Sequence, residues 1–373
     1  MVTAPSSPRP DLSDLSLDPR LVLIGHDPLN AELPLPEQVG VITPNPLFYK
    51  RNHFAVPRIA AADWRLRIEG EVERPVELTY DELRALPSRA HLVTLECAGN
   101  GRSTLQPVAD GEPWQFGAVS TAEWTGVPLA AVLERAGLTA RAREIVAEGA
   151  DRGSVAAIGK TISYGRGLDR ETAEHPDTLL AYAMNGEPLP PEHGFPVRLV
   201  VPGWYGMASV KWVTRLEAIA GRFDGFYQVD RYVMAHPERG ATSKIPLRAM
   251  HVRSLITRPV AGAAIIEGAH RVHGLAWSGA APVKRVEVSV DGGATWDVAD
   301  LTSRPERYAW RRWEYLWQVT AAGPVELRSR AFDEAGNTQP GTPEWNRLGY
   351  ANNAVQTVAV TVIADRPRSE QSQ

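Results

Sequence analysis

The chain has 373 residues, of which 43% are hydrophobic and 23% are charged, and its formal net charge is −4. This length allows two or three domains that each bury a core. The charge excludes a nucleic acid or an anionic membrane surface as an expected partner, and no stretch is apolar for long enough to span a bilayer.

Cysteine occurs once, at position 97. A single cysteine forms no internal disulfide, so no oxidising compartment is implied. Iron–sulfur clusters and covalently attached haem need further cysteines, and we therefore expect neither an iron–sulfur cluster nor a haem. The first residues carry no apolar signal segment, which predicts a cytoplasmic protein; a periplasmic location would follow only if a signal had been removed.

Composition and predicted secondary structure divide the chain into three parts. Residues 1–20 are rich in Ser, Pro and Asp and are predicted to be a disordered tail. Residues 21–245 mix short strand and helix patterns, whereas residues 246–373 show only short alternating strands separated by Pro and Gly turns. We therefore predict an α+β domain followed by an immunoglobulin-like all-β sandwich.

Two helices are predicted in the α+β domain. Thr79 is expected to cap a short helix, with Glu82 in the capping-box position. Residues 128–136 form an amphipathic helix that Gly137 ends. Strands are expected at residues 64–70 and 145–148, and a turn at residues 150–153.

A strand pattern at residues 93–96 leads directly into Cys97. Gly and Asn in the following loop tolerate positive φ, and Arg102 is close enough to favour the thiolate. A thiolate is a soft metal ligand, although a lone cysteine is more often a small buried hydrophobe. From the residues alone both interpretations stay open.

Residues 193–211 combine cationic side chains with a Gly-rich loop. His193 and Arg198 flank a Gly-Phe-Pro segment, and Lys211 ends the loop. Such a set suits a phosphate, which needs cations and free backbone amides. There is no Walker or dinucleotide glycine motif, so neither a nucleoside triphosphate nor NAD is expected.

In the β part, Trp310, Trp313 and Trp317 supply apolar area for a core or for a partner face. His270 and His273 lack a cysteine or carboxylate at zinc-ligand spacing, so we interpret them as structural.

The segment Cys-Ala-Gly-Asn followed by an arginine, at residues 97–102, resembles the molybdenum-ligand segment of the sulfite oxidase family of molybdopterin enzymes. Three further motifs are similar and occur in the same order: Phe-x-x-Arg-Asn-His at 48–53, His-Gly-x-Pro-x-Arg at 193–198 and Val-Lys-Trp at 210–212. The resemblance covers about residues 45–365. It implies a molybdopterin-binding domain followed by a sandwich that forms a homodimer.

The resemblance also implies roles for particular residues. Cys97 would hold molybdenum of a molybdenum–molybdopterin cofactor. The residues implied to act in catalysis are Cys97, Arg51, Arg102, Trp114 and Tyr232, with Tyr227 as the alternative to Tyr232. Those implied to bind the cofactor are Arg51, Asn52, His53, Asp151, His193, Arg198, Ser209, Val210 and Lys211.

The implied function is oxidation of sulfite, a small oxyanion, to sulfate, with electrons passed to a separate acceptor protein. Two departures from the family pattern leave a reductase of nitrate or of an S-oxide as an alternative. Asp110 stands where family sulfite oxidases often have lysine. Leu348 stands where Trp-Asn-x-Arg-Gly has its arginine, and Arg347 is one place earlier. A non-catalytic binding protein that retains the fold is the third interpretation.

Overall fold

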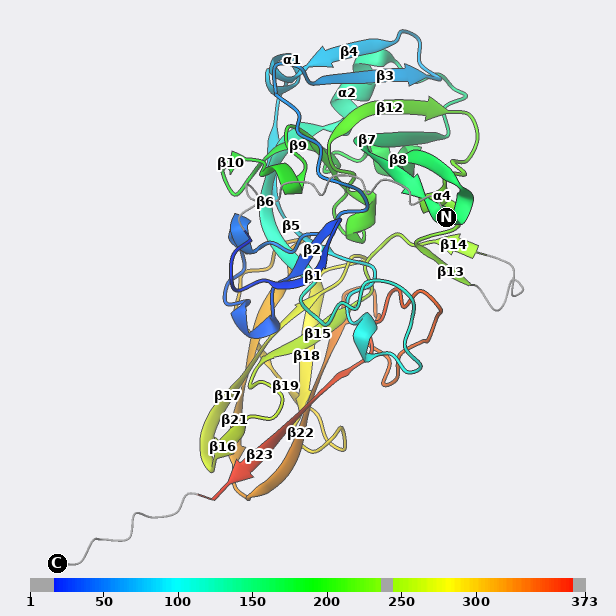
Figure 1. Cartoon of the computed structure of the whole chain (residues 1–373). Coiled ribbons are helices and arrows are strands. Elements are labelled where there is room, and N and C mark those ends of the chain that lie inside the picture. The colour runs from blue at the N-terminus through cyan, green and yellow to red at the C-terminus, as the bar shows by residue number, and fades with distance from the viewer. Residues whose placement is uncertain (1–16, 236–243, 365–373) are drawn as a thin grey trace, which may run out of the picture.

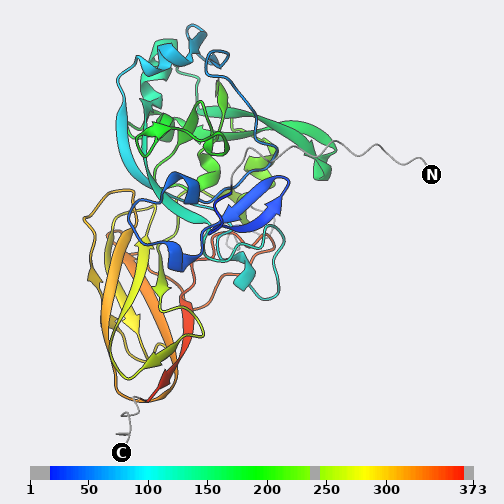
Figure 2. The same ribbon diagram turned by 60° about the vertical axis from the view of Figure 1, so that its left-hand side comes forward.

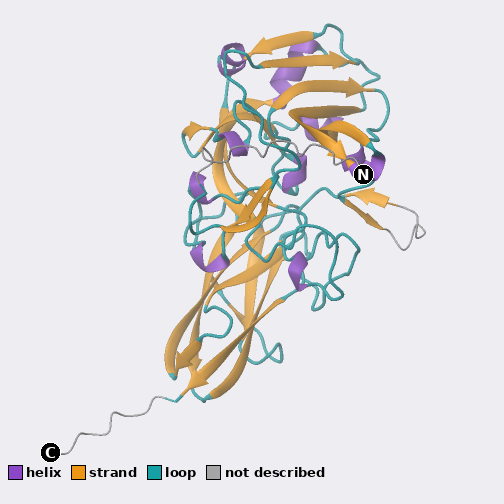
Figure 3. Cartoon of the chain, in the orientation of Figure 1, coloured by secondary structure: helices purple, strands orange, loops and turns teal. Residues whose placement is uncertain are grey.

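The computed structural model describes residues 17–235 and 244–364 (Figure 1), so residues 1–16 of the predicted tail lie outside the described residues. Strands dominate (Figure 3), and the α-helices of the described part have eight residues or fewer. The α+β prediction is therefore correct only in part, because these helices are too short to form a layer of their own. None of the described helices has the length and apolarity to cross a bilayer.

Two five-stranded sheets form the first part of the molecule (Figures 1 and 2). The first sheet contains β10 (Glu187–Pro188), β9 (Leu179–Met184), β6 (Val119–Pro128) and β5 (Arg89–Glu96) in that order, with β11 (Arg198–Val200) also paired to β9. The second contains β4 (Val76–Thr79), β3 (Arg65–Gly70), β12 (Val213–Ile219), β7 (Glu144–Val155) and β8 (Lys160–Asp169). Only the β3–β12 pair of these is parallel.

Short elements surround these sheets. The helices are α1 (Tyr80–Arg84), α2 (Leu129–Ala136), α3 (Arg170–Glu174) and α4 (Phe226–Val229). The 3-10 turns are η1 (Leu35–Glu37), η2 (Asn45–Leu47), η3 (Arg102–Thr104), η4 (Ala156–Ile158), η5 (Pro191–His193) and η6 (Gly206–Ala208). Two small hairpins pair β1 (Val22–His26) with β2 (Leu29–Glu32), and β13 (Val233–Ala235) with β14 (Lys244–Pro246).

Both predicted helices are present where the local signals indicated them. The Thr79 hydroxyl accepts from the Glu82 N–H, and the Glu82 carboxylate accepts from the Thr79 N–H, which completes the capping box. Helix α2 ends at Gly137, whose φ of 71° favours glycine. The local sequence was sufficient to predict these two helix ends, because each signal depends on contacts between residues at most four positions apart.

The turn predicted at residues 150–153 is wrong. Strand β7 runs through this stretch and continues pairing with β8, but the register shifts between Glu148 and Arg152. The shift is a β-bulge, which inserts extra residues without ending a strand. Asp151 therefore projects from a bulged strand and not from a turn.

Two further sheets form the C-terminal part. One contains β15 (Arg253–Arg258), β17 (Gly268–Trp277), β21 (Arg311–Val319) and β20 (Asp300–Leu301). The other contains β16 (Ala264–Ile266), β23 (Gln356–Ile363), β22 (Gly323–Asp333), β18 (Val283–Ser289) and β19 (Asp297–Val298). Side chains of both sheets share one core that includes Trp313 and Trp317, so these tryptophans are core residues. The immunoglobulin-like subtype and the boundary at residue 245 stay predictions.

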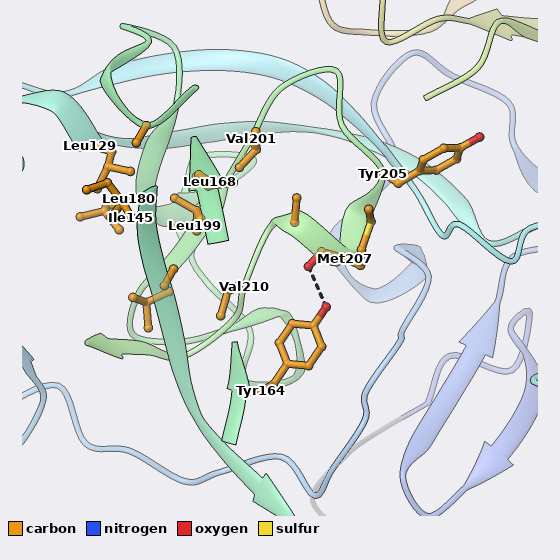
Figure 4. Packing of buried hydrophobic residues seen from close by; sticks show 14 of the residues in the cluster. Leu129, Ile145, Tyr164, Leu168, Leu180, Leu199, Val201, Tyr205, Met207 and Val210 are labelled. Atoms are coloured by element: carbon orange, nitrogen blue, oxygen red, sulfur yellow. Dashed lines mark hydrogen bonds between the residues drawn. The ribbon is translucent and has the colours of Figure 1, made fainter. Parts of the chain in front are cut away.

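The largest core crosses between the two parts of the chain. It includes Leu129, Ile145 and Leu180 of the first part (Figure 4) together with Leu255 and Trp277 of the C-terminal sheets. Trp310 belongs to the same cluster. The two parts therefore bury apolar surface against each other and are not independent bodies.

A buried carboxylate ties the two parts together at the end of β5. Glu96 accepts hydrogen bonds from Arg253 of β15 at 2.6 Å and from the Trp277 indole of β17 at 2.9 Å. The side chains of Glu96 and Arg253 are each only 2% exposed. Burial of two charges is tolerated because they are paired and hydrogen-bonded.

We expect Arg253→Met to lower the free energy of unfolding by about 3–5 kcal/mol, because Glu96 would then be a buried charge without its partner. Chemical denaturation followed by tryptophan fluorescence measures this loss. Arg271→Met is the matched control: Arg271 is 54% exposed and pairs with Glu314, and such surface pairs contribute about 0.2–1 kcal/mol. Equal losses in the two variants would contradict the expectation.

Candidate active site

Two neighbouring cavities meet at the end of β5. The inner cavity is lined mainly by buried side chains and the outer cavity, of about 450 Å³, has an exposed rim. Four residues line both cavities: Arg51, His53, Cys97 and Tyr232. These four therefore form the boundary between the inner and outer cavities.

Cys97 follows β5 directly, in a loop that backbone hydrogen bonds hold on both sides. Its N–H donates to the carbonyl of Ala118, and its carbonyl accepts from the N–H of Asn100. Burial raises the pKa of the thiol, and the positive charges of Arg51 and Arg102 act in the opposite direction. The predicted effect of Arg102 is therefore present, but the effect of burial on the pKa outweighs it.

Arg102 bridges two loops beside Cys97. Its guanidinium donates to the carbonyl of Glu112 at 2.6 Å and to that of Leu348 at 2.8 Å. A Cβ at Gly99 would collide with this guanidinium, which explains the glycine at that position. Trp114 is fully buried and lines the outer cavity together with Arg102. Its indole N–H has no hydrogen-bond partner among the described residues.

The segment of residues 51–53 is fixed by the β1–β2 hairpin. The side-chain oxygen of Asn30 accepts from the N–H of Asn52 at 2.7 Å, and the Asn52 amide donates to the carbonyl of Leu29. Arg51 donates to Asn30 at 3.5 Å and to the carbonyl of Asn52. The guanidinium of Arg51 is thus held at the boundary of the cavities.

His53 and Tyr232 are hydrogen-bonded across that boundary. His53 Nε2 lies 2.6 Å from the Tyr232 hydroxyl, and the His53 ring stacks on Tyr164. Burial and the nearby charges of Arg51 and Lys211 hold the pKa of His53 well below its usual range. Burial also raises the pKa of Tyr232. Both groups are therefore neutral at pH 7, and a neutral pair can pass or hold a proton.

Tyr227, the alternative to Tyr232, lines only the outer cavity. Its ring packs against His53 at 4.7 Å. The geometry therefore favours Tyr232 as the residue at the boundary.

Most of the predicted cofactor residues line the inner cavity. They are Arg51, Asn52, His53, Asp151, His193, Arg198, Ser209 and Lys211. Val210 differs, since its side chain lies in the core (Figure 4) and its N–H and carbonyl are bonded to Ala208 and Leu199. Its role toward a cofactor stays a prediction.

Arg198 joins two of these segments. It donates to the carbonyl of His193 at 3.0 Å and to that of Ser209 at 3.1 Å. Burial lowers the pKa of Arg198 to about 10, so it remains charged at neutral pH. Arg198 thus helps to set the shape of the inner cavity by linking two of the segments that line it.

Unpaired polar groups in the inner cavity provide a test of whether it suits a cofactor. His193 Nε2 and Asp151 Oδ1 are buried and have no hydrogen-bond partner among the described residues. Such groups are costly unless something binds them. A pterin carries both ring donors and ring acceptors, and a molybdenum centre suits the soft sulfur of Cys97. The residues present therefore fit a molybdenum–molybdopterin group.

The sequence interpretation missed three side chains of this region. Tyr164 stacks on His53, Arg166 lies 6.0 Å from the Tyr232 ring, and Tyr350 stacks on Tyr232 at 5.0 Å. Tyr164 and Arg166 sit in an ordinary strand, so no local signal marks them. Tyr350 follows the Trp-Asn-x-x-Gly segment at once, and that motif could have drawn attention to it.

The two departures from the family pattern lie side by side at the rim of the outer cavity. Arg347 donates to the Asp110 carboxylate at 2.8 Å, and both side chains are 65% exposed. The loop that carries Asp110 and the loop that carries Arg347 are adjacent in both views (Figures 1 and 2). Leu348 lines the cavity and packs against the largest core.

Two protein-family models match this chain. "Oxidoreductase molybdopterin binding domain" matches residues 53–227, and "Mo-co oxidoreductase dimerisation domain" matches residues 244–363. Sulfite oxidase of Gallus gallus is 38% identical over 94% of this chain and 80% of its own length. Mitochondrial sulfite oxidase of Mus musculus is 37% identical over 96% of this chain and 69% of its own length.

A nitrate reductase and a solved structure are also similar. Nitrate reductase [NAD(P)H] of Hordeum vulgare is 37% identical over 92% of this chain and 42% of its own length. The crystal structure of the sulfane dehydrogenase SoxCD from Paracoccus pantotrophus superposes with a TM-score of 0.78 and 32% identity, covering 89% of this chain and 84% of that one. The names of these relatives all describe oxidoreductases, but they name different substrates: sulfite, nitrate and sulfane.

We expect the stability of the cofactor-free protein to depend on Asp151. Burial raises the pKa of this carboxyl to about 7, with Lys211 opposing the shift. Between about pH 4 and pH 7 the unfolded chain has already lost this proton while the folded one retains it, so Asp151 makes stability fall as pH rises. Asp151→Asn should remove that slope, of up to about 1.4 kcal/mol per pH unit.

Thermal unfolding of both proteins from pH 4.5 to pH 7.5 checks this expectation. Asp63→Asn, on an exposed loop, controls for the loss of a carboxylate. A difference between wild type and Asp151→Asn that stays constant with pH would count against it.

Proposed function

Because the chain belongs to the sulfite oxidase family of molybdopterin-dependent oxidoreductases, we propose that it oxidises sulfite to sulfate and passes the electrons to a separate acceptor. The reaction consumes sulfite and water and releases sulfate, two protons and two electrons. The molybdenum–molybdopterin group supplies the two-electron oxo-transfer chemistry. The protein supplies binding, orientation and charge.

One observation carries the proposal: Cys97, Arg51, His53 and Tyr232 line both cavities. A residue with this position reaches the cofactor on one side and the substrate on the other. Cys97 is the soft ligand for the metal. Arg51 is the cation for the oxyanion, since a guanidinium binds an oxyanion through two parallel hydrogen bonds.

The inner cavity holds the pterin in this proposal. Asp151 and His193 offer unpaired polar atoms to the ring system, and Lys211 offers its ammonium beside Asn52. The predicted ligands Ser209 and Val210 contribute at the end of the Gly-rich loop. Arg198 fixes the position of His193 relative to Ser209 through its hydrogen bonds to the carbonyls of both residues.

The outer cavity binds the substrate. Arg51 and Arg102 attract the anion and stabilise negative charge where it develops. Trp114 closes one side with an indole N–H free to donate. The hydrogen-bonded Tyr232 and His53 would hold a proton at the boundary of the two cavities. Both are neutral, so they do not compete with the anion for the arginines.

The electron acceptor, the oligomeric state and the cellular location of the enzyme are also part of the proposal. The electrons leave to an external protein acceptor, and the expectation of neither a haem nor an iron–sulfur cluster on this chain stays a prediction. The C-terminal sandwich forms a homodimer, in line with the dimerisation-domain match. We keep the cytoplasmic location as a prediction.

A reductase of nitrate or of an S-oxide is the second candidate, and one feature favours it. The outer cavity has Leu348 in place of the family arginine, and Arg347 is neutralised by Asp110. This removes positive charge that a sulfite dianion would use. Steady-state assays of sulfite, nitrate and methionine sulfoxide with artificial electron carriers separate the candidates: turnover of nitrate or the sulfoxide without sulfite oxidation would reject the proposal.

Cys97→Ser should abolish sulfite turnover while the fold is retained, because a hydroxyl is a poor substitute for a soft thiolate ligand. Activity per bound molybdenum, metal content and circular dichroism check this together. Ser103→Ala, an exposed change six residues along the same loop, is the control. A fully active Cys97→Ser enzyme would refute the assignment.

Arg51→Gln should raise KM for sulfite about 10- to 100-fold, because hydrogen bonds to charged groups are worth about 1.5–3 kcal/mol. The KM is measured per molybdenum-loaded site, so that altered cofactor content is separated from altered binding. Arg231→Gln removes a cation that lines only the outer cavity and should change KM less. A larger effect at Arg231 would place the anion elsewhere.

A further inference from the structure

We propose that the outer cavity also accepts organic sulfinates, R–SO2⁻, and that the enzyme oxidises them to the corresponding sulfonates. This inference rests on the proposed function, because it uses the same anion site and the same transfer of oxygen to sulfur. It extends the substrate class from an inorganic oxyanion to one with an uncharged organic group.

The first argument is size. The outer cavity measures about 450 Å³, within the range of about 300–1,000 Å³ typical of pockets for organic ligands. Sulfite has four heavy atoms, and a water molecule takes about 30 Å³ of liquid. An inorganic oxyanion at Arg51 therefore leaves most of the cavity to water.

The second argument is the chemical character of one side of the cavity. We call this side the apolar wall; it consists of Phe54, Val155, Ala156, Ala157, Phe226 and Tyr227. Phe54 contacts Tyr227 and packs against Gly153 of β7, and Phe226 contacts Tyr227 at 5.1 Å. The wall is thus built from Phe54, α4 and the end of the β7–β8 hairpin. Contact between such a surface and an apolar substituent is favourable, because it removes apolar area from water.

The third argument is the distribution of charge. Arg51 and Arg102 line the outer cavity together with Cys97. Farther out, Arg347 is paired with Asp110, and Arg231, a further cation of the outer cavity, lies over the Phe226 ring at 5.0 Å. Attraction for an anion is therefore concentrated beside Cys97 and is weaker at the mouth. This arrangement suits an anionic head at the boundary and an uncharged tail in the outer cavity.

Leu348 contributes to the same arrangement. It lines the outer cavity with an apolar side chain, whereas an arginine at this position would bring a charge and a long stem into the space. Its carbonyl still accepts from Arg102, so the backbone supports the anion site while the side chain leaves room for the tail.

The chemistry parallels sulfite oxidation. A sulfinate sulfur carries a lone pair, as the sulfur of sulfite does. One S–O bond forms, the C–S bond is kept, and R–SO2⁻ plus water becomes R–SO3⁻, two protons and two electrons. The electrons go to the same external acceptor as in sulfite oxidation, which ferricyanide replaces in the assay by accepting one electron per ion.

The test compares sulfite, methanesulfinate and benzenesulfinate on the molybdenum-loaded enzyme, with sulfonate formation measured by mass spectrometry. We expect benzenesulfinate to be turned over with a KM at least tenfold below that of methanesulfinate. Binding of the unreactive benzenesulfonate, measured by calorimetry on the same protein, gives a readout that is independent of turnover. Cys97→Ser protein controls for oxidation of sulfinate by ferricyanide alone.

Two variants probe the tail site. Ala157→Asp puts a charge on the apolar wall, and Leu348→Arg puts one on another part of the outer-cavity lining. Each should lower kcat/KM for benzenesulfinate relative to that for sulfite about tenfold or more. Ile158→Asp is the matched control, since Ile158 is exposed on the same 3-10 turn η4 but does not line the cavity. It should leave the ratio unchanged.

The outcomes separate this inference from the proposed function. Sulfite turnover with no benzenesulfinate turnover and no benzenesulfonate binding overturns the inference alone. A ratio that falls equally in Ala157→Asp and Ile158→Asp also overturns it. Failure to oxidise sulfite while nitrate or a sulfoxide is reduced overturns the proposed function instead.

Discussion

A single buried carboxylate organises this protein. Glu96 ends the strand before Cys97 and accepts from Arg253 and Trp277 of the C-terminal sheets and from Asn100 of its own loop. Because separating a buried ion pair leaves an uncompensated charge, the position of the Cys97 loop is coupled to the packing of the two parts of the chain. The dimerisation domain is therefore also a support of the candidate active site.

The same junction explains how the two cavities are built. Residues 97–102 receive further bonds from the C-terminal part, in which Ala351 donates to the carbonyl of Ala98 and Asn352 to that of Gly101. The loop of residues 347–350 then closes one side of the outer cavity. Within this late segment Leu348 lines the outer cavity but not the inner one, so a change there can alter the space for a substrate without changing the lining of the inner cavity.

Sequence reasoning succeeded where a signal acts over a few residues and failed where distant segments decide. The Thr79 capping box and the end of α2 at Gly137 follow from local hydrogen bonding and φ preference. The turn predicted around Asp151 became a β-bulge, because pairing with β8 supplies partners that the local sequence does not reveal. Arg198 was expected to bind an anion, yet two of its bonds hold the carbonyls of His193 and Ser209.

The sequence by itself determined the family, the lone sulfur and the order of the motifs, because these are properties of residue type and spacing. Only the tertiary structure decided that Cys97, Arg51, His53 and Tyr232 share one boundary, and that Asp110 and Arg347, 237 positions apart, neutralise each other. Contacts between such distant positions depend on how strands pair and on which buried charges find partners, and spacing along the chain encodes neither directly.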